Sequence, residues 1–187
     1  MKIYFDGCSV TYGAELMYPE DERYSKHVAR HFGAEDYNLA RGGGSNRRIL
    51  RNLLNHNVYE FDMFVIQMTK RARTEFMKDG KWQRIQTSVP HPYLADMYDD
   101  EYGKIDEQIM YHAIKNILKD RKHFILTIQH DTVLPIYACN EPYSMAPRGH
   151  PNKEGHKFFA DVVIRGLEGE NDIWQKSFRR LDHNQRY

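Results

Sequence analysis

The chain has 187 residues, and 27 Lys and Arg against 26 Asp and Glu leave a formal net charge of +1. That length fits one domain, the even balance lacks the basic excess of a nucleic-acid-binding surface, and no apolar run reaches the ~20 residues of a membrane span. The first residues lack the apolar core of a secretory signal, and two cysteines cannot build a disulfide framework. We therefore expect a protein of the reducing cytoplasm.

Strand-like and helix-like segments alternate along the chain, which predicts an α/β fold with a mainly parallel sheet. In the first half, the expected elements are a strand at 2–6, a helix at 20–32 with Gly33 as C-cap, a short strand at 37–40, a helix from Ser45 or Asn46, and a strand at 61–68. The segment 61–68 is nearly continuously apolar, as is typical of a central parallel strand covered on both faces.

The second half opens with a polar stretch, 69–104, that is rich in Tyr, Asp and Pro and has no sustained period. Such a long connection is usually functional or disordered, so we expect an insertion that acts as a lid or contacts a protein partner or a second copy. The remaining expected elements are an amphipathic helix at 105–118, a strand at 124–129, and a helix from Pro151 or Asn152. The apolar face of the first of these is expected to carry Ile105, Ile109, Met110, Ala113, Ile114, Ile117 and Leu118. The domain then spans 1–168 and leaves a polar tail, 169–187.

Three expected loops carry residues that can do chemistry, and parallel strands place such loops at one edge of the sheet. Ser9 follows the first strand, Gly42, Gly43 and Gly44 follow the second, and His150 precedes the last helix. A serine can attack an acyl carbon, a histidine can take its proton, and backbone N–H groups can hold the oxyanion.

Each feature also has an ordinary structural explanation. A serine beside glycine is common in turns, consecutive glycines usually form a tight or flexible loop, and the residues around His150 can simply start a helix. A metal site of His150, His156 and Asp161 is disfavoured, because the histidine spacing does not place both rings on one helix face. A nucleotide site at 42–44 lacks a phosphate-binding fingerprint. We therefore expect no metal and no cofactor.

Taken in order, these segments resemble the SGNH (GDSL-like) hydrolase superfamily from residue 3 to about 163. Gly7-Cys8-Ser9-Val10-Thr11 resembles the block that carries the nucleophile, 38–46 resembles the second block with Gly43 as the oxyanion glycine, and 147–156 resembles the last block with His150 as the base. The resemblance implies a three-layer, flavodoxin-like sandwich in which Ser9 attacks an ester and the N–H groups of Ser9 and Gly43 hold the oxyanion.

The sequence departs from the family pattern at three positions. Cys8 replaces the Asp of the first block, Pro147 replaces the triad Asp, and 69–71 lack the Asn that completes the oxyanion hole. This variant of the first block is similar to divergent SGNH-like proteins encoded by tailed bacteriophages.

Other side chains could supply the missing groups. The candidates are Lys70, Arg71 and Arg73 for the oxyanion Asn, and Asp131, Glu141 and Glu154 for the triad acid. Cys8 could also be the nucleophile near a helix N-terminus, although a free cysteine is more often a small buried hydrophobe.

The residues and the resemblance together predict a serine esterase that acts on a carbohydrate or small ester, with acetyl as the favoured acyl group and no nucleic-acid or membrane partner. The alternative keeps the fold without catalysis, as a binding or structural protein such as a phage virion or accessory component. The insertion at 69–104 carries aromatic residues that could stack on sugars or pack on a protein partner. They are Trp82, Tyr93, Tyr98 and Tyr102.

Overall fold

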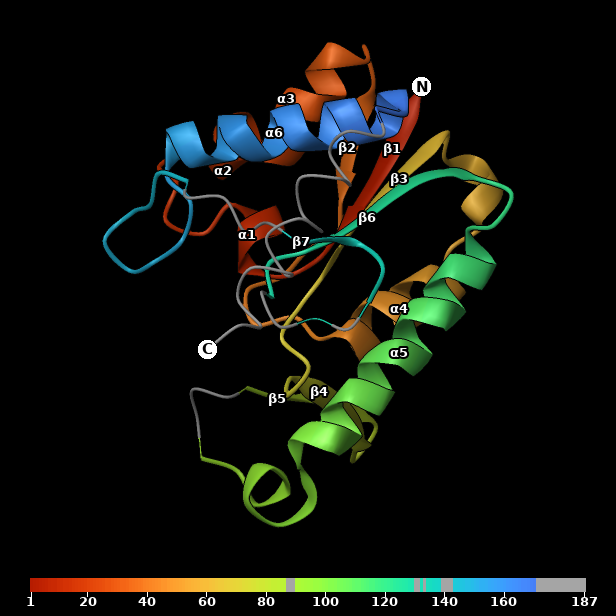
Figure 1. Ribbon diagram of the computed structural model, residues 1–187, viewed down its shortest axis with the longest axis vertical. Coiled ribbons are helices and arrows are strands. Elements are labelled where there is room, and N and C mark those ends of the chain that lie inside the picture. The colour runs from red at the N-terminus through yellow and green to blue at the C-terminus, as the bar shows by residue number, and fades with distance from the viewer. Residues whose placement is uncertain (87–89, 130–131, 133, 139–142, 171–187) are drawn as a thin grey trace, which may run out of the picture.

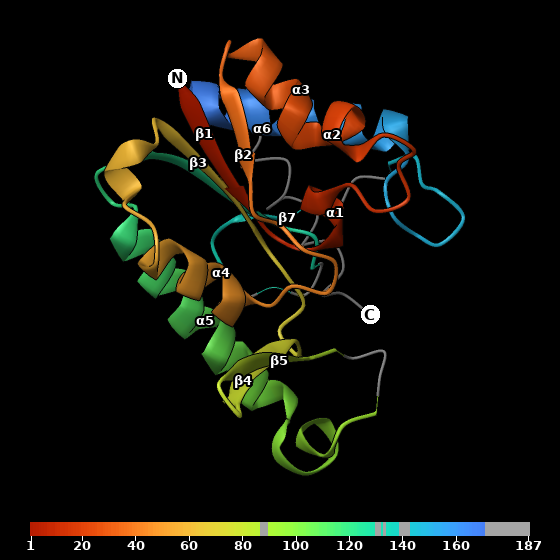
Figure 2. The same ribbon diagram turned by 180° about the vertical axis from the view of Figure 1, so that it is seen from behind.

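A parallel five-stranded sheet in the order β2-β1-β3-β6-β7 forms the centre of the molecule. The structure is a computed structural model that describes residues 1–170 except 87–89, 130–131, 133, 139–142 and the side chains of Tyr93 and Met97. Helices cover both faces of the sheet (Figures 1 and 2). This strand order is that of flavodoxin-like folds, so the predicted three-layer α/β sandwich is confirmed.

The central strand is buried along its whole length. The strands of this sheet are β1 (Lys2–Asp6), β2 (Glu35–Asn38), β3 (Met63–Met68), β6 (Lys122–Thr127) and β7 (Tyr137–Ala138). Every residue of β3 is buried, as predicted for a parallel strand covered on both faces. The register pairs Phe5 with Val65 and Val65 with Phe124, and these three side chains share one core cluster.

The helices form two layers that enclose this sheet. They are α1 (Ser9–Tyr12), α2 (Pro19–Glu22), α3 (Tyr24–His31), α4 (Asn46–Leu54), α5 (Asp100–Ile117) and α6 (Lys153–Glu168), with single turns at η1 (Val58–Glu60) and η2 (Tyr93–Met97). On one face α3 packs beside α6, and on the other α4 packs beside α5 (Figure 1). Among the described residues, no helix is both long and apolar enough to cross a membrane.

Two predicted helix starts are confirmed by their caps. The Ser45 hydroxyl accepts the Arg48 N–H at the start of α4, and the Asn152 side chain accepts two N–H groups at the start of α6. The single helix predicted at 20–32 is wrong, because Arg23 is extended and separates α2 from α3. The Arg23 guanidinium binds the Asp36 carboxylate, in the edge strand β2, at 2.9 Å.

The helix predicted at 105–118 begins earlier, where the Asp99 carboxylate accepts the Tyr102 N–H and caps α5. Ile105 and Ile109 are 50% and 55% exposed, so their predicted burial is wrong. The expected burial of Met110 and Ile114 is confirmed, and the buried face of α5 also includes Gly103, Glu107 and Tyr111.

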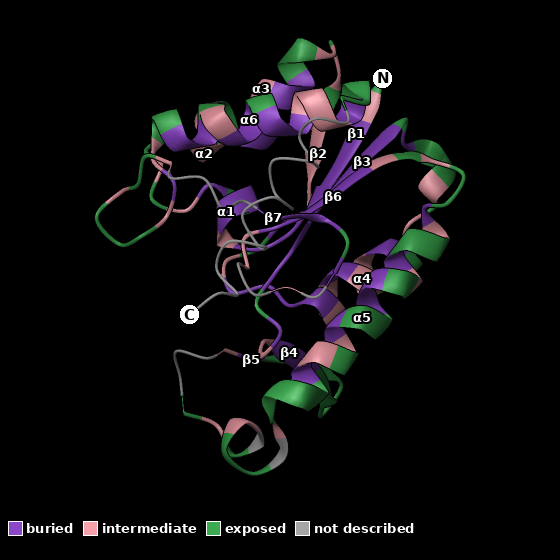
Figure 3. Ribbon diagram, in the orientation of Figure 1, coloured by how far each residue is buried: buried purple, intermediate pink, exposed green. Residues whose placement is uncertain are grey.

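A hairpin takes up part of the expected aperiodic insertion. β4 (Thr74–Lys78) and β5 (Lys81–Ile85) pair antiparallel around Asp79 and Gly80, which both have positive φ. An Asp-Gly pair with positive φ at both positions makes the tight turn that suits a hairpin. The hairpin lies beside α4, and Figure 3 shows buried residues concentrated in the main sheet while the hairpin and the start of α5 are largely exposed.

Candidate active site

The end of β1 leads directly into α1, whose first residue is Ser9. Ser9 is half-buried, and its Oγ lies 3.9 Å from the buried Sγ of Cys8. Within the described part of the chain, no hydrogen bond uses the Ser9 N–H. The hydroxyl and this N–H are therefore the groups that α1 leaves for a substrate.

A buried polar network holds the turn beneath Ser9. The Gln67 carboxamide accepts from the Thr11 hydroxyl at 2.7 Å and donates to Cys8 Sγ at 3.2 Å. A Cβ at Gly7 would lie 2.3 Å from Thr11 Oγ1 and 2.9 Å from Gln67 Cβ, so only glycine fits. Cys8 faces this network rather than solvent, which leaves Ser9 as the accessible nucleophile candidate.

His150 binds a carboxylate that comes from the connection between α1 and α2. Its Nδ1 lies 2.6 Å from Oε2 of Glu15. The same carboxylate accepts the backbone N–H groups of Arg148, at 2.9 Å, and of His150, at 3.1 Å. The side chains of Glu15 and His150 are 15% and 30% exposed, so the pair is shielded but open to solvent.

The environment of Glu15 fixes its ionisation and the orientation of the ring. Burial acts to raise the pKa of Glu15. The hydrogen bonds from His150 and from the two backbone N–H groups outweigh this effect and hold the pKa of Glu15 below its usual range. An ionised Glu15 can only accept a hydrogen bond, so Nδ1 of His150 carries the proton and donates to it, and Nε2 is left as the basic nitrogen. Glu15 has φ 70°, a strained conformation that is common at functional sites.

No hydrogen bond in the described residues joins Ser9 Oγ to His150. The loop before α6 nevertheless lies beside α2 and the connection that follows α1, to which the Glu15 contacts tie it (Figures 1 and 2). Catalytic hydrogen bonds are often long in ligand-free sites and tighten when substrate binds. The structure thus connects His150 to the segment that follows Ser9, through Glu15, without direct contact between the two predicted residues.

The glycine loop reaches the edge of the sheet at which Ser9 lies. A Cβ at Gly44 would lie 2.8 Å from the Gly7 carbonyl oxygen, so the loop packs directly on the turn before Ser9. Gly43 has φ 70°, and no hydrogen bond among the described residues uses its N–H. A Cβ at Gly43 would lie 2.3 Å from Oε1 of Gln86, so this side chain from the end of the hairpin rests against the loop.

Buried ion pairing holds the glycine loop in place. The Arg48 guanidinium binds the fully buried Asp6 at 3.0 Å and the Leu39 carbonyl at 2.6 Å. Asn52 donates a further hydrogen bond to Asp6, at 2.8 Å. The ends of β1 and β2 are therefore joined through α4.

Two of the predicted replacements for the oxyanion Asn, Arg71 and Arg73, are engaged in contacts within the protein. Asn46 binds both the N–H and the carbonyl of Thr69 and so fixes the loop after β3. Arg71 is directed to α5, 3.3 Å from Asp100 and 3.8 Å from Glu107, and Arg73 donates to the Thr69 hydroxyl at 2.9 Å. We leave both arginines out of the site.

The carboxylate that contacts His150 was not among those predicted from the sequence. Asp131 and Glu141 lie outside the described residues, and exposed Glu154 pairs with Lys157 at 2.8 Å. Glu15 matches no block of the family pattern and sits far from His150 in sequence, so only the folded chain brings the two together. In the part of the chain that the structure describes, no cluster of His, Cys, Asp and Glu could hold a metal ion.

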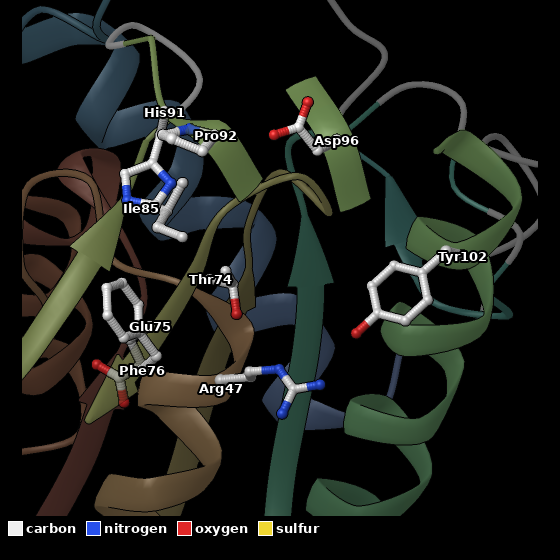
Figure 4. A pocket seen from close by; sticks show the side chains of 9 residues that line it. All are labelled: Arg47, Thr74, Glu75, Phe76, Ile85, His91, Pro92, Asp96 and Tyr102. Atoms are coloured by element: carbon white, nitrogen blue, oxygen red, sulfur yellow. The ribbon is translucent and has the colours of Figure 1, made fainter. Parts of the chain in front are cut away.

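Two cavities flank the β4–β5 hairpin. The smaller, of about 220 Å³, reaches from Gly43 and Gly44 to Trp82 and Arg84. The larger has a volume of about 530 Å³. Neither cavity is lined by Ser9 or His150. Figure 4 shows the larger cavity between the hairpin, the start of α4 and the start of α5.

The predicted aromatic residues of the insertion divide between these places. Tyr102 points toward Arg47 across the larger cavity (Figure 4), whereas Trp82 lines the smaller one. Tyr98 packs on Gly103, where a Cβ would lie 2.3 Å from its hydroxyl. The Tyr93 side chain is outside the described residues.

No protein-family model and no curated protein sequence matches the chain. Among solved structures, it is similar to a carbohydrate esterase whose active site is described as having divergent catalytic and non-catalytic binding functions (TM-score 0.61, 14% identity, covering 92% of this chain and 66% of that one). It is also similar to an acetyl xylan esterase from Butyrivibrio proteoclasticus (TM-score 0.55, 11% identity, 92% and 64% covered). A third similar structure is a member of the lipolytic G-D-S-L family from Veillonella parvula (TM-score 0.52, 12% identity, 91% and 98% covered).

The chain thus spans just under two thirds of the length of the two carbohydrate-active relatives and nearly all of the lipolytic one. At these identities the likeness is one of backbone arrangement and carries no residue-level assignment. It follows that this chain has the α/β fold that carbohydrate esterases and G-D-S-L lipolytic proteins share.

Proposed function

We propose that the protein is a serine hydrolase of the SGNH type that removes an acyl group from an ester, with acetyl esters of carbohydrates as the favoured substrates. The observation that carries the proposal is the Glu15–His150 pair, in which two backbone N–H groups of the loop before α6 also bind the Glu15 carboxylate. This pair restores the acid that the sequence lacks before His150. The fold, which carbohydrate esterases share, supports the same class of reaction.

The first half of the reaction forms an acyl-enzyme. Ser9 Oγ attacks the acyl carbon while its proton passes to Nε2 of His150, and Glu15 stabilises the resulting imidazolium. The carbonyl oxygen becomes an oxyanion that the N–H groups of Ser9 and Gly43 hold. Collapse of the intermediate breaks the ester C–O bond, and His150 gives its proton to the leaving alcohol.

The second half frees the enzyme by hydrolysis. A water molecule gives a proton to His150 and attacks the acyl carbon, and the bond to Ser9 breaks as the proton returns to Oγ. The carboxylic acid then leaves. Two N–H donors in place of the family's three groups reduce oxyanion stabilisation, since one donor is typically worth roughly 10²–10³-fold in rate.

The test is hydrolysis of 4-nitrophenyl acetate and of acetylated xylo-oligosaccharides by the wild type and three variants. We expect turnover that Ser9→Ala and His150→Ala reduce to background and Cys8→Ala largely retains, because the Cys8 sulfur faces the buried network. A fluorophosphonate should label the wild type at Ser9, as located by mass spectrometry, and should not label Ser9→Ala. Activity that survives in Ser9→Ala would contradict the proposed nucleophile.

Two observations favour a second candidate, a binding protein that keeps the fold without catalysis. Ser9 Oγ makes no hydrogen bond to His150 among the described residues, and Gln86 rests against the proposed oxyanion glycine, Gly43. The absence of both turnover and fluorophosphonate labelling would favour this candidate. A relationship to phage proteins, a virion role and a cytoplasmic location remain predictions from the sequence.

A further inference from the structure

The smaller cavity beside Gly43 is rich in arginine. Its wall includes Arg41 from the glycine loop, Arg48 and Arg51 from α4, and Arg84 from β5. One carboxylate, Glu75, also lines it. Four cations around a space of about 220 Å³ raise the question of which charges are already neutralised.

Two of these arginines are fully engaged within the protein. Arg48 binds buried Asp6 at 3.0 Å, and Arg51 binds both oxygens of Glu75, at 2.6 and 3.1 Å. These paired charges cancel at short range. They hold the wall of the cavity together and leave little net charge for a ligand.

The other two arginines have no carboxylate partner in the described part of the chain. Arg84 donates to the Gly42 carbonyl at 2.6 Å, which fixes its guanidinium over the glycine loop without neutralising it. Arg41 is exposed and takes part in no ion pair among the described residues. The cavity therefore presents two uncompensated positive charges close to the proposed oxyanion site at Gly43.

An aromatic surface adjoins these charges. Trp82 lies over the Arg51 guanidinium at 4.5 Å from the ring centroid, which fixes the indole in a cation–π contact. It remains 47% exposed, so part of the ring is available to a ligand. An indole face next to guanidinium groups suits a molecule that has both an apolar ring face and an anionic group, as an acidic sugar does.

We propose that this cavity binds the anionic group of a sugar, so that the ester cleaved at Ser9 is carried on an acidic carbohydrate. The inference rests on the proposed function, because the proposed oxyanion glycine, Gly43, lines the cavity. Guanidinium groups bind carboxylate, phosphate and sulfate oxygens in two-point, charge-assisted hydrogen bonds. Arg41 and Arg84 hold the anion, and Trp82 packs on the sugar ring.

The test is a binding titration on the Ser9→Ala protein, in which NMR chemical shifts of its amide and indole N–H groups report binding. The probes share one sugar frame: galactose, galacturonate, galactose 6-phosphate and galactose 6-sulfate. We expect one or more of the three anionic sugars to shift the NMR signals of the Gly42–Ser45 amides and the Trp82 indole. Their affinity should fall as the salt concentration rises, because salt screens the charges. The probe that binds best identifies which anion the site prefers, and galactose should leave these signals unchanged.

Variants locate the site and supply the control. Arg41→Gln and Arg84→Gln should each weaken binding of the anionic sugar roughly tenfold, the scale of one hydrogen bond to a charged group. Lys78→Gln removes a charge from the same hairpin outside the cavity and should bind as the parent does. Equal binding of galactose, no binding of any probe, or equal losses in all three variants would overturn the inference.

The titration separates this inference from the esterase proposal, because Ser9→Ala binds without turning over. Binding at the cavity by a protein that hydrolyses no ester would retain the anion site and reject the catalytic role. Ester hydrolysis without binding of any anionic sugar would reject only the anion site.

Discussion

At the scale of single residues, Glu15 decides how the candidate site can work. A histidine becomes an effective base for serine when a carboxylate fixes its tautomer and stabilises the imidazolium. Glu15 makes this contact at 2.6 Å from a backbone position with φ 70°. The backbone N–H groups of Arg148 and His150 bind the same carboxylate, which ties the strained residue to the loop it serves.

Glu15→Gln removes the negative charge and keeps the shape and one acceptor oxygen. We expect kcat for ester hydrolysis to fall roughly 10³–10⁴-fold with a small change in KM, because the ring loses its fixed tautomer and the imidazolium its counter-charge. Glu15→Asp should retain part of the rate, since it keeps the negative charge but places it farther from the His150 ring. Steady-state kinetics at matched protein concentration measure both effects.

Glu22→Gln is the matched control for this change. Glu22 also bridges to the start of α6, through Lys153 at 3.0 Å, but it does not contact His150. Both variants should melt close to the wild type, and only Glu15→Gln should lose kcat. An equal loss of rate in both would show that Glu15 acts through loop stability alone.

Sequence reasoning could predict Ser9, Gly43 and His150, because each lies in a local motif at the end of an expected element. It could not predict Glu15, because the contact depends on how the connection after α1 folds toward the loop before α6. It also could not exclude Arg71, whose guanidinium is held by Asp100 on a helix that begins before the predicted one. Long-range pairing of charges is decided by packing, which a single sequence does not display.

At the scale of elements, the local rules succeeded where side chains act on their own backbone. Ser45 and Asn152 were predicted as helix starts and cap α4 and α6. The Asp79-Gly80 turn carries an equally local signal, but its flanking strands are short and largely exposed, so they lack the apolar alternation that marks a strand. The break at Arg23 follows from a tertiary ion pair with Asp36 and has no local signal.

The cap at Asn152 does more than start α6. Its Oδ1 accepts the Glu154 and Gly155 N–H groups at 3.1 Å, and its Nδ2 donates to the Ser144 hydroxyl at 2.7 Å. Asn152→Ala should cost about 1 kcal/mol of folding free energy and lower Tm by about 2–4 °C. It should also lower kcat/KM, because the same cap anchors the loop that carries His150.

Asp99→Ala provides the comparison for this element. Asp99 caps α5 by accepting the Tyr102 N–H at 2.7 Å, far from His150 along the chain and in another helix layer. We expect a similar loss of Tm, measured by calorimetry, with little change in kcat/KM. Equal activity in the two variants would show that the Asn152 cap does not position His150.

At the scale of the whole molecule, the strand order places the turn at Ser9 and the glycine loop at one edge of the sheet. β1 and β2 are neighbours, so the turn at Ser9 and the glycine loop meet where these strands end. This arrangement could be predicted from alternating helix and strand patterns, because doubly wound parallel sheets bind ligands beyond the carboxyl ends of their strands. The insertion could not be placed, since its hairpin packs on α4 through ion pairs such as Arg51–Glu75.

The packing of α3 against α6 makes the stability of the molecule depend on pH through His156. This ring is fully buried, stacks on Tyr24, and accepts the Tyr24 N–H at Nδ1 with a length of 3.1 Å. Burial, and then the neighbouring His27 and His150, lower the pKa of His156 to about 4. A histidine in the unfolded chain titrates near ~6.5.

Between these two pKa values the unfolded chain binds a proton at residue 156 that the folded protein does not bind. The free energy of unfolding is therefore largest above about pH 6.5 and falls as the pH is lowered toward 4, by about 2 kcal/mol between pH 7 and pH 5 from this ring. His156→Asn keeps an acceptor for the Tyr24 N–H but cannot titrate, so its loss between pH 7 and pH 5 should be smaller by that amount. Urea denaturation of both proteins at the two pH values measures the difference, in which contributions from groups such as His27 cancel. Parallel pH dependence in the two proteins would show that His156 is protonated in the fold and that the α3–α6 interface tolerates its charge.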